Sequence, residues 1–177
     1  MGRRIAAVLL CLGAVATPAA QPAVLAPYSP TPMDVVARML KFAGVGQRDV
    51  LYDLGCGDGR IVIEAARLHG ARAVGIDIDP SLIAQARANA RKAGVEDRVT
   101  FRVQDAMTVD LSDATVVTLY LLAASNVKLR PILMRDLEPG ARIVAHNYPI
   151  GDWEPDVVDN FTDAAGTART LFLWRMK

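Results

Sequence analysis

A glycine-rich loop and two aspartates are the residues of this sequence whose types and spacing could bind a ligand. Residues 53–60 read Asp-Leu-Gly-Cys-Gly-Asp-Gly-Arg, so that Gly55, Gly57 and Gly59 alternate directly after a short apolar run. Glycine lets a backbone approach a ligand closely, and the N-terminus of a following helix presents unpaired N–H groups to polar atoms. The spacing is one residue shorter than the Gly-x-Gly-x-x-Gly of dinucleotide-binding loops, which disfavours NAD or FAD. A tight turn without a ligand gives the same pattern, so the neighbouring residues must decide.

The two aspartates follow later apolar runs and supply that context. Asp77 ends the run 71–77, and Asp105 comes just after the run 99–103. A carboxylate at the position of Asp77 can accept hydrogen bonds from both hydroxyls of a ribose lying over the glycine turn. Ligands of open α/β sheets bind at the edge where the parallel strands end. We therefore expect the glycine loop, Asp77 and Asp105 to share one site, although either acid alone could be a solvated strand end.

The elements that must position these residues follow from the alternation of apolar runs with helical patterns. Such alternation is typical of repeated βαβ units and a largely parallel sheet. Strands are expected at 50–54, 71–77, 99–103, 115–120 and 142–147, followed by two antiparallel strands at about 156–161 and 168–175. Helices are expected at 33–42, 60–69, 80–93 and about 123–137, with Thr31 as the N-cap of the first and Pro32 at its first position. The pattern predicts a doubly wound α/β domain with helices on both faces.

Composition agrees with one catalytic-size domain. The chain has 177 residues, 52% of them hydrophobic, which is enough for one sizeable core and too short for a second domain of ordinary size. The 20 Lys and Arg residues are balanced by 19 Asp and Glu residues, and no long run of either sign occurs. Nothing in this charge pattern indicates nucleic-acid binding.

The first residues follow a different pattern from the rest. Arg3 and Arg4 give a basic start, residues 5–16 are apolar, and small residues after them offer a cleavage site. This arrangement predicts a secretory signal peptide over residues 1–20, followed by a proline-rich segment over 21–32 and the domain proper over 33–177. The domain is therefore expected to be exported. The alternative is an uncleaved membrane anchor, in which case this segment would be the only membrane contact.

Taken with the loop and the two aspartates, the sequence from Tyr28 to Lys177 resembles the seven-stranded class I S-adenosylmethionine-dependent methyltransferases. The resemblance implies the strand order 3-2-1-4-5-7-6 with a reversed last strand, and S-adenosyl-L-methionine as the cofactor. It implies that Asp53 supports the cofactor pocket, that the three glycines approach the amino-acid part of the cofactor, and that Asp77 holds the ribose. Asp105 would contact the adenine amine, with Ile78 and Ala106 flanking the adenine ring.

Four further segments narrow the resemblance. They are Pro-Tyr28-Ser-Pro-Thr31-Pro, the loop Tyr-Asp-Leu-Gly-Cys-Gly-Asp-Gly-Arg60, Thr118-Leu-Tyr120-Leu-Leu and His146 with Trp153. Together they are similar to a small family of protein-lysine methyltransferases that has archaeal members and mitochondrial ones, the latter acting on a nucleotide carrier or on a component of the ATP synthase. The resemblance implies a protein lysine as the methyl acceptor and places Tyr28 and Thr31 among the cofactor-binding residues.

Methyl transfer to an amine requires alignment, exclusion of water and a neutral acceptor, and it requires neither a metal nor a covalent nucleophile. Lysine has a reference pKa of about 10.4, so the site must lower that pKa or accept the proton. Tyr120 is expected nearest the transferred methyl group, and His146 with Asn147 is expected to take a proton or orient the acceptor. Trp153 is a candidate wall of the acceptor site. Each of these side chains also has a purely structural alternative, as core packing.

Two other functions remain open from the residues alone. A small-molecule methyltransferase shares the fold, but such enzymes often carry extra lid helices for which this chain has little length. A non-catalytic secreted domain that binds S-adenosylmethionine or a nucleoside would explain the leader.

Overall fold

The computed structural model describes residues 25–177, so the predicted signal peptide and the start of the proline-rich segment lie outside the described residues. Within this range, no helix combines the length and the apolar composition needed to cross a membrane. The predictions of export and of a membrane anchor therefore stay predictions.

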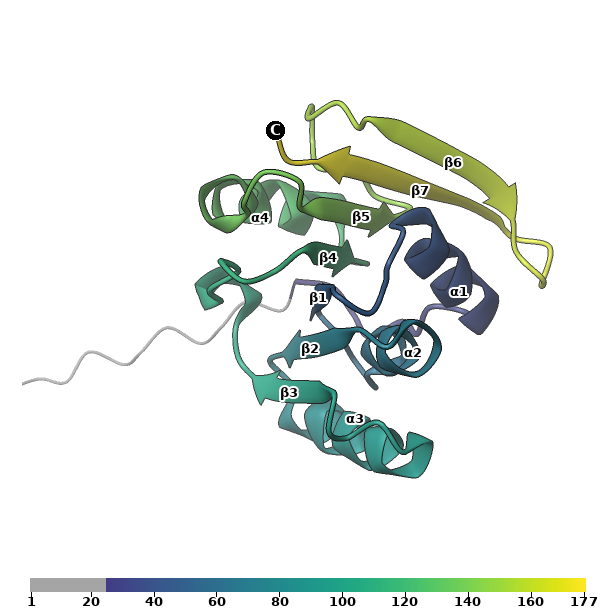
Figure 1. The fold of residues 1–177 in the computed structure, drawn as a ribbon. Coiled ribbons are helices and arrows are strands. Elements are labelled where there is room, and N and C mark those ends of the chain that lie inside the picture. Colours follow the sequence, from purple (N-terminus) through teal and green to yellow (C-terminus); the bar gives the residue numbers. More distant parts are fainter. Residues whose placement is uncertain (1–24) are drawn as a thin grey trace, which may run out of the picture.

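Seven strands form one sheet in the order β3-β2-β1-β4-β5-β7-β6 (Figure 1). The strands are β1 (Val50–Leu54), β2 (Arg72–Asp77), β3 (Val99–Val103), β4 (Val116–Leu119), β5 (Arg142–His146), β6 (Val157–Thr162) and β7 (Ala168–Arg175). Strands β1 to β5 are parallel, whereas β7 runs antiparallel to both β5 and β6. The predicted fold class and strand order are confirmed.

Helices cover both faces of the sheet. Figure 1 shows α1 (Met33–Phe42) and α2 (Arg60–His69) on one side of the sheet and α4 (Ala123–Asp136) on the other. The side chains of α3 (Pro80–Ala93) join the core formed with α1 and α2, and those of α4 join the core on the opposite face. Because both faces are covered, the central strands β1 and β4 are buried along their whole length.

The start of α1 corrects one expectation. The sequence predicts Thr31 as the N-cap, but Pro32 occupies that position with φ −54° and ψ 145°, and the helix begins at Met33. The first helical hydrogen bond runs from the Val36 N–H to the Pro32 carbonyl. Thr31, which precedes a proline and is therefore biased away from helical backbone, instead offers its carbonyl oxygen to Arg60 at 2.8 Å. The segment before α1 is thus tied to the start of α2.

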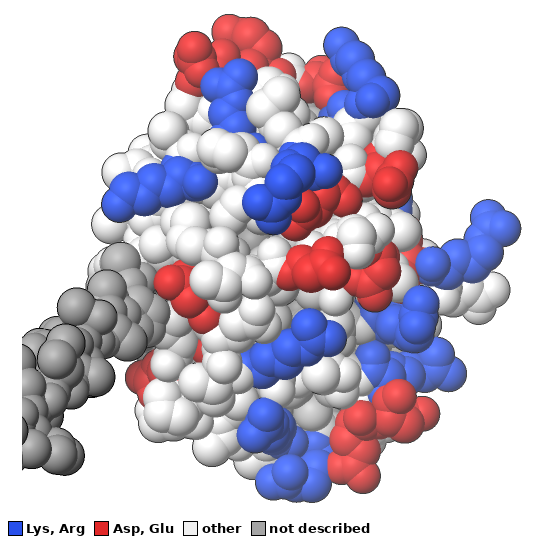
Figure 2. Space-filling model, turned by 90° about the vertical axis from the view of Figure 1, so that its left-hand side faces the viewer, with Lys and Arg blue, Asp and Glu red and all other residues white. Residues whose placement is uncertain are grey.

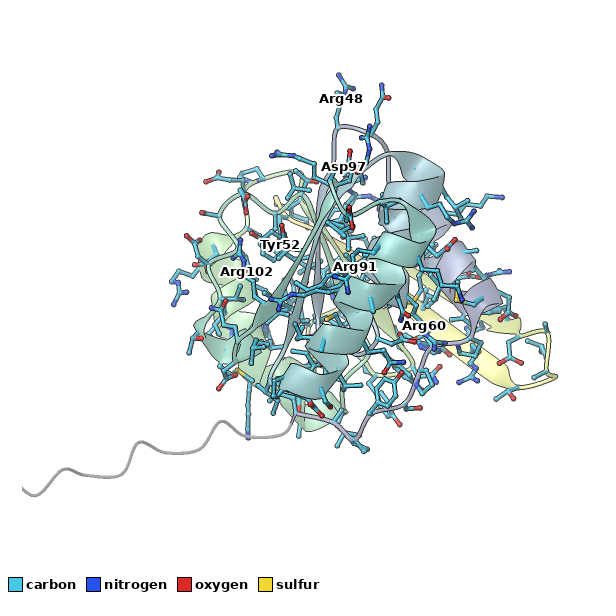
Figure 3. All side chains as sticks on the ribbon, turned by 90° about the horizontal axis from the view of Figure 1, so that it is seen from below. Arg48, Tyr52, Arg60, Arg91, Asp97 and Arg102 are labelled. Carbon is cyan, nitrogen blue, oxygen red and sulfur yellow. The ribbon has the colours of Figure 1, made fainter. Side chains whose placement is uncertain are left out.

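Strands β4 and β5 each end one residue earlier than predicted, so Tyr120 and Asn147 follow these strands instead of ending them. Both residues still lie at the carboxyl edge of the sheet, with the glycine loop after β1. Arg48 and Asp97 precede β1 and β3 and mark the opposite edge. In Figure 3 those two residues lie at the top, whereas Arg60, after the glycine loop, lies far below them. The glycine loop, Tyr120 and Asn147 therefore lie at one edge of the sheet.

Candidate active site

The glycine loop between β1 and α2 is built for close approach. Gly55, Gly57 and Gly59 all have positive φ, at 84°, 53° and 80°. The N–H groups of Gly55 and Cys56 both donate to the Ile76 carbonyl, at 2.8 and 2.9 Å, which fixes the loop against β2. A Cβ atom on Gly57 would lie 2.6 Å from the Tyr28 ring. The loop therefore requires glycine here for both backbone conformation and space.

Asp77 holds the loop from the neighbouring strand. Its Oδ2 accepts a hydrogen bond from the Gly57 N–H at 2.9 Å, and its Oδ1 accepts one from the Asp79 N–H at 3.0 Å. Each carboxylate oxygen has two lone pairs, so capacity remains for further donors. Asp77 lines the cavity beside the loop. A carboxylate in this position can accept hydrogen bonds from two ribose hydroxyls.

Asp53 is the buried acid of the site. Its carboxyl group is almost fully buried and accepts a hydrogen bond from the Thr118 hydroxyl at 2.8 Å. Burial raises the pKa of Asp53 to about 7; the Thr118 hydrogen bond opposes this shift, and the carboxylates of Asp77 and Asp58 add to it. A cation placed beside Asp53 would favour its ionised form.

Residues 25–31, called the strap here, cross the cavity from α4 to α2. The Ser125 hydroxyl donates to the Leu25 carbonyl at one end, and Arg60 donates to the Thr31 carbonyl at the other. Arg60 is itself held by an ion pair with Asp58 at 2.6 Å. The Tyr28 ring lies over Gly57 between these two attachments. Sequence reasoning missed Ser125 and the Asp58–Arg60 pair, although the charged residues beside the glycines were a visible signal.

The cavity enclosed by these elements contains most of the predicted cofactor-binding residues. Those that line it are Tyr28, Thr31, Asp53, Gly55, Gly57, Asp77, Ile78 and Ala106. Gly59 and Asp105 are not among the lining residues. A Cβ atom on Gly59 would meet Phe101 at 2.7 Å, so this glycine allows α2 to pack closely. Asp105 accepts a hydrogen bond from the Met107 N–H at 2.9 Å and caps a short 3-10 helix, while its neighbours Gln104 and Ala106 face the cavity.

The chemistry of this lining fits S-adenosylmethionine. The glycine loop leaves room for backbone contact, and Asp77 offers carboxylate oxygens to hydroxyl groups. Ile78, Leu82 and Ala106 provide apolar surface for a flat ring. The buried Asp53 carboxyl group is suited to a cationic end of the ligand.

Tyr120 connects the cavity to a cluster of polar and aromatic side chains at the ends of β4 and β5. It lines the cavity, and its ring centroid lies 4.1 Å from that of His146. His146 is fully buried, and neither ring nitrogen has a hydrogen-bond partner among residues 25–177. Burial, assisted by the positive charge of Arg169 and opposed by Asp163, lowers the pKa of His146 to about 4. The imidazole is therefore neutral at neutral pH and adjoins the residue expected nearest the reaction.

The chain reverses sharply directly after His146. Asn147 has φ 62°, and the Tyr148 N–H donates to the His146 carbonyl at 2.8 Å, which closes a three-residue turn of the γ type. The Asn126 side-chain amide on α4 donates to the Tyr148 carbonyl at 2.9 Å. The Tyr148 ring then stacks beside Tyr120 with centroids 6.5 Å apart. Strained turns of this kind are often found at functional sites.

Trp153 does not belong to this cluster around Tyr120 and His146. Its ring packs against Trp174 with centroids 5.9 Å apart, and the Arg130 guanidinium lies over it at 5.5 Å. It is not among the residues that line the cavity. The structure therefore brings together Tyr120, His146 and Asn147, and it places Tyr148 next to them, a residue that the sequence analysis did not select. An aromatic side chain directly after two predicted site residues was the available signal.

Comparison with known proteins agrees with this geometry. The model of the family described as the ANTKMT methyltransferase domain matches residues 53–157. A protein-lysine N-methyltransferase of Saccharolobus islandicus is 46% identical over 84% of this chain and 92% of its own length. A human lysine N-methyltransferase, named for a component of the ATP synthase, is 35% identical over 85% of this chain and 65% of its own length.

A solved structure gives a further comparison. The crystal structure of an RNA methyltransferase from Salinibacter ruber in complex with S-adenosyl-L-homocysteine has a TM-score of 0.78 and 55% identity, covering 84% of this chain and 94% of that one. The family match spans the glycine loop, Asp77, Tyr120 and His146, which are the residues that the fold gathers at one edge. The chain therefore belongs to the family of the ANTKMT methyltransferase domain, within the class I S-adenosylmethionine-dependent methyltransferases.

Proposed function

We propose that this chain transfers a methyl group from S-adenosylmethionine to the ε-amine of a lysine in a protein. The observation that carries the proposal is the position of Tyr120, which lines the cavity and whose ring packs at a tilt against that of a buried, neutral His146. Two relatives that match most of the chain are lysine N-methyltransferases.

The cofactor side of the reaction rests on the cavity residues. Asp77 receives the ribose hydroxyls, Ile78 and Ala106 flank the adenine, and Asp53 faces the positively charged end. When bound there, S-adenosylmethionine supplies a methyl group activated by its sulfonium sulfur. The glycine loop and the strap keep water from this group on two sides, which suits an in-line displacement in a dry site.

The acceptor side needs a neutral amine held in line with the methyl group. Tyr120 and Tyr148 offer aromatic faces, and aromatic faces attract ammonium groups electrostatically. The neutral His146 imidazole can take a hydrogen bond or a proton without a competing partner among the described residues. These groups match an ε-amine better than a carboxylate, which would be repelled by the ring faces.

RNA is the second candidate acceptor, because a chain 55% identical to this one is described as an RNA methyltransferase. The surface charge favours the protein acceptor. Nucleic-acid binding depends on a basic patch that neutralises phosphates, whereas Figure 2 shows acidic and basic side chains interspersed over the face that it presents. The formal net charge of the whole chain is only +1.

The test is a labelling experiment that separates these acceptors. The full chain is incubated with S-adenosylmethionine carrying a deuterated methyl group and an extract of its source organism, in three arms: untreated, treated with ribonuclease and treated with protease. We expect mass spectrometry to find the label on protein lysines, resistant to ribonuclease. Label that ribonuclease releases would assign RNA as the acceptor, and label found only on small molecules would refute both.

Tyr120→Phe serves as the matched variant in that experiment. The substitution removes the hydroxyl but keeps the ring, so it should lower turnover while leaving cofactor affinity unchanged. A loss of cofactor affinity instead would place Tyr120 in the cofactor site and not beside the acceptor.

A further inference from the structure

Arg169, on β7, is fixed by a buried carboxylate in the loop that joins β6 to β7. Its Nε donates to Asp163 Oδ2 at 2.8 Å, and the Asp163 side chain is fully buried. Asp163 Oδ1 accepts the N–H groups of Ala165 and Thr167 at 3.0 and 2.8 Å. With three hydrogen bonds accepted and its side chain buried, this carboxylate is out of reach of a substrate. Its effect is to hold the guanidinium in place.

The register of β7 brings Arg169 to the carboxyl edge beside the acceptor site. Leu171 pairs with His146, and the Asn147 N–H donates to the Thr170 carbonyl at 2.8 Å. Arg169 is two residues from Leu171 and therefore on the same face of the sheet as His146. The pKa of Arg169 is raised, first by the hydrogen bond to Asp163 and also by the Tyr120 side chain. By the register of β5 and β7, Arg169 lies diagonally from His146 on the same face of the sheet, within reach of a long side chain, and the His146 ring centroid is 4.1 Å from that of Tyr120.

We propose that Arg169 is a positioning residue of the acceptor site, whose fixed positive charge keeps the incoming lysine amine neutral beside Tyr120. This inference rests on the proposed lysine acceptor. A like charge nearby disfavours an ammonium group and lowers its pKa, which is one way in which proteins activate lysine nucleophiles.

The other charged groups around this site are already engaged. On α1, Asp34 accepts the Ala164 N–H at 2.7 Å, and Arg38 forms a bidentate ion pair with Asp159 of β6. The two charged groups that act on His146 are Arg169, which lowers its pKa, and Asp163, which raises it. Because the Asp163 oxygens are enclosed, Arg169 is the charge that a lysine would meet.

The same charge acts on the acceptor before methyl transfer and on the product after it. The lysine releases its proton to solvent on entering the site, and its neutral nitrogen then forms a bond to the methyl carbon. The bond between that carbon and sulfur breaks, with its electron pair moving to sulfur to give S-adenosylhomocysteine. The methylated nitrogen carries a positive charge, and repulsion by Arg169 then favours its departure.

The test compares Arg169→Gln and Arg169→Lys, with Arg38→Gln as the control for loss of an arginine–aspartate ion pair away from Tyr120. The pH profile of kcat/KM is measured with the labelled lysine protein found above. We expect Arg169→Gln to move the rising limb of the profile upward by about one pH unit and to lower the rate at pH 7.5 about tenfold. Arg169→Lys should restore the profile, and Arg38→Gln should leave it unchanged.

A second measurement needs no acceptor. The chain has two histidines, and only His146 is buried, so NMR titration resolves it from His69. Arg169→Gln should raise the pKa of His146, and Arg38→Gln should not. An unmoved His146 pKa, or an unmoved rate profile in Arg169→Gln, would overturn the proposal. If Arg169→Gln fails to fold because Asp163 is left buried without its partner, the double variant Asp163→Asn with Arg169→Gln removes both charges. Their effects on the pKa of His146 oppose each other, so the pH profile of the rate is the readout for this variant, and its rising limb should still move upward.

The two proposals fail in different ways. A label on RNA in the experiment above would end the lysine assignment, whatever Arg169 does. A label on lysine with an unchanged pH profile in Arg169→Gln would leave the lysine assignment standing and reject the role of Arg169.

Discussion

Two carboxylates of the cavity, Asp53 and Asp77, differ in what surrounds them, and therefore differ in what they do. Asp77 is partly exposed and accepts two backbone N–H groups, which fixes the glycine loop and aims its remaining lone pairs. Asp53 is buried with a single hydroxyl partner, Thr118, and its pKa is raised to about 7. Asp77 therefore fixes the shape of the glycine loop, whereas Asp53 makes the charge of the cavity depend on pH.

Replacement of Asp77 by Ala should weaken cofactor binding by about 1–3 kcal/mol, because the ribose hydroxyls would lose their acceptor on entering the cavity. Calorimetric titration with S-adenosylmethionine measures the effect, and Asp110→Ala at an exposed position is the control. Unchanged affinity in a folded Asp77→Ala protein would mean that the cofactor binds elsewhere.

Cofactor affinity should rise between about pH 5 and pH 8, because Asp53 ionises over that range and the ligand is cationic. The stability of the folded protein should change with pH in the opposite direction. The folded state raises this pKa, so the stabilisation due to the protonated form is fully present below the unfolded pKa and is lost as pH rises through about 7. Asp53→Asn should flatten both dependences, measured by titration calorimetry and by denaturant unfolding. A pH dependence of binding that survives in Asp53→Asn would assign it to another group.

At the scale of elements, the helices α2 and α3 could be predicted to the residue because their ends are encoded locally. Gly70 and Gly94 take left-handed backbone at the ends of α2 and α3, and Asp79 caps the start of α3 by accepting the Ser81 and Leu82 N–H groups. The start of α1 could not be placed as well, since the choice between Thr31 and Pro32 depends on a contact with Arg60, far along the chain.

The residues of the candidate site also fall into those that adjacent sequence predicts and those that depend on the folded sheet. The glycine loop and Asp77 were predictable because a strand end and a turn are read from adjacent residues. Asn126, Tyr148 and Arg169 were not, because each acts through a neighbour that only the folded sheet supplies. Trp153 was predicted to be part of the acceptor site because it follows β5 closely in sequence. In the structure its ring packs on Trp174 instead.

Helix α4 supports the turn after β5 through one side chain, so Asn126→Ala should disturb that turn. The Tyr148 carbonyl would lose its partner, and the free energy of unfolding should fall by about 1–3 kcal/mol. Turnover should fall while cofactor affinity is kept. Denaturant unfolding and steady-state kinetics measure these effects, and exposed Lys128→Ala on the same helix is the control. An Asn126→Ala variant with parental kcat would separate the turn from the reaction.

At the scale of the whole molecule, the strap connects the cavity to the segment that precedes residue 25. Export remains our proposal, based on the basic start and the apolar residues 5–16. N-terminal sequencing of the protein isolated from its source organism should find a mature chain that begins between Thr17 and Ala23. An intact Met1 on soluble protein would reject export, and an intact Met1 on membrane-bound protein would favour the anchor.

The attachment of the strap at both of its ends has a consequence for the time course of catalysis. Ser125 holds Leu25, Arg60 holds Thr31, and Tyr28 covers the loop between them. We predict that the spent cofactor leaves only after this cover lifts, so that its dissociation is the slow step of each cycle. Rapid-quench measurements should show a burst, with a fast first turnover and slower ones after it. Ser125→Ala, which releases one end, should speed the later turnovers and leave the first unchanged.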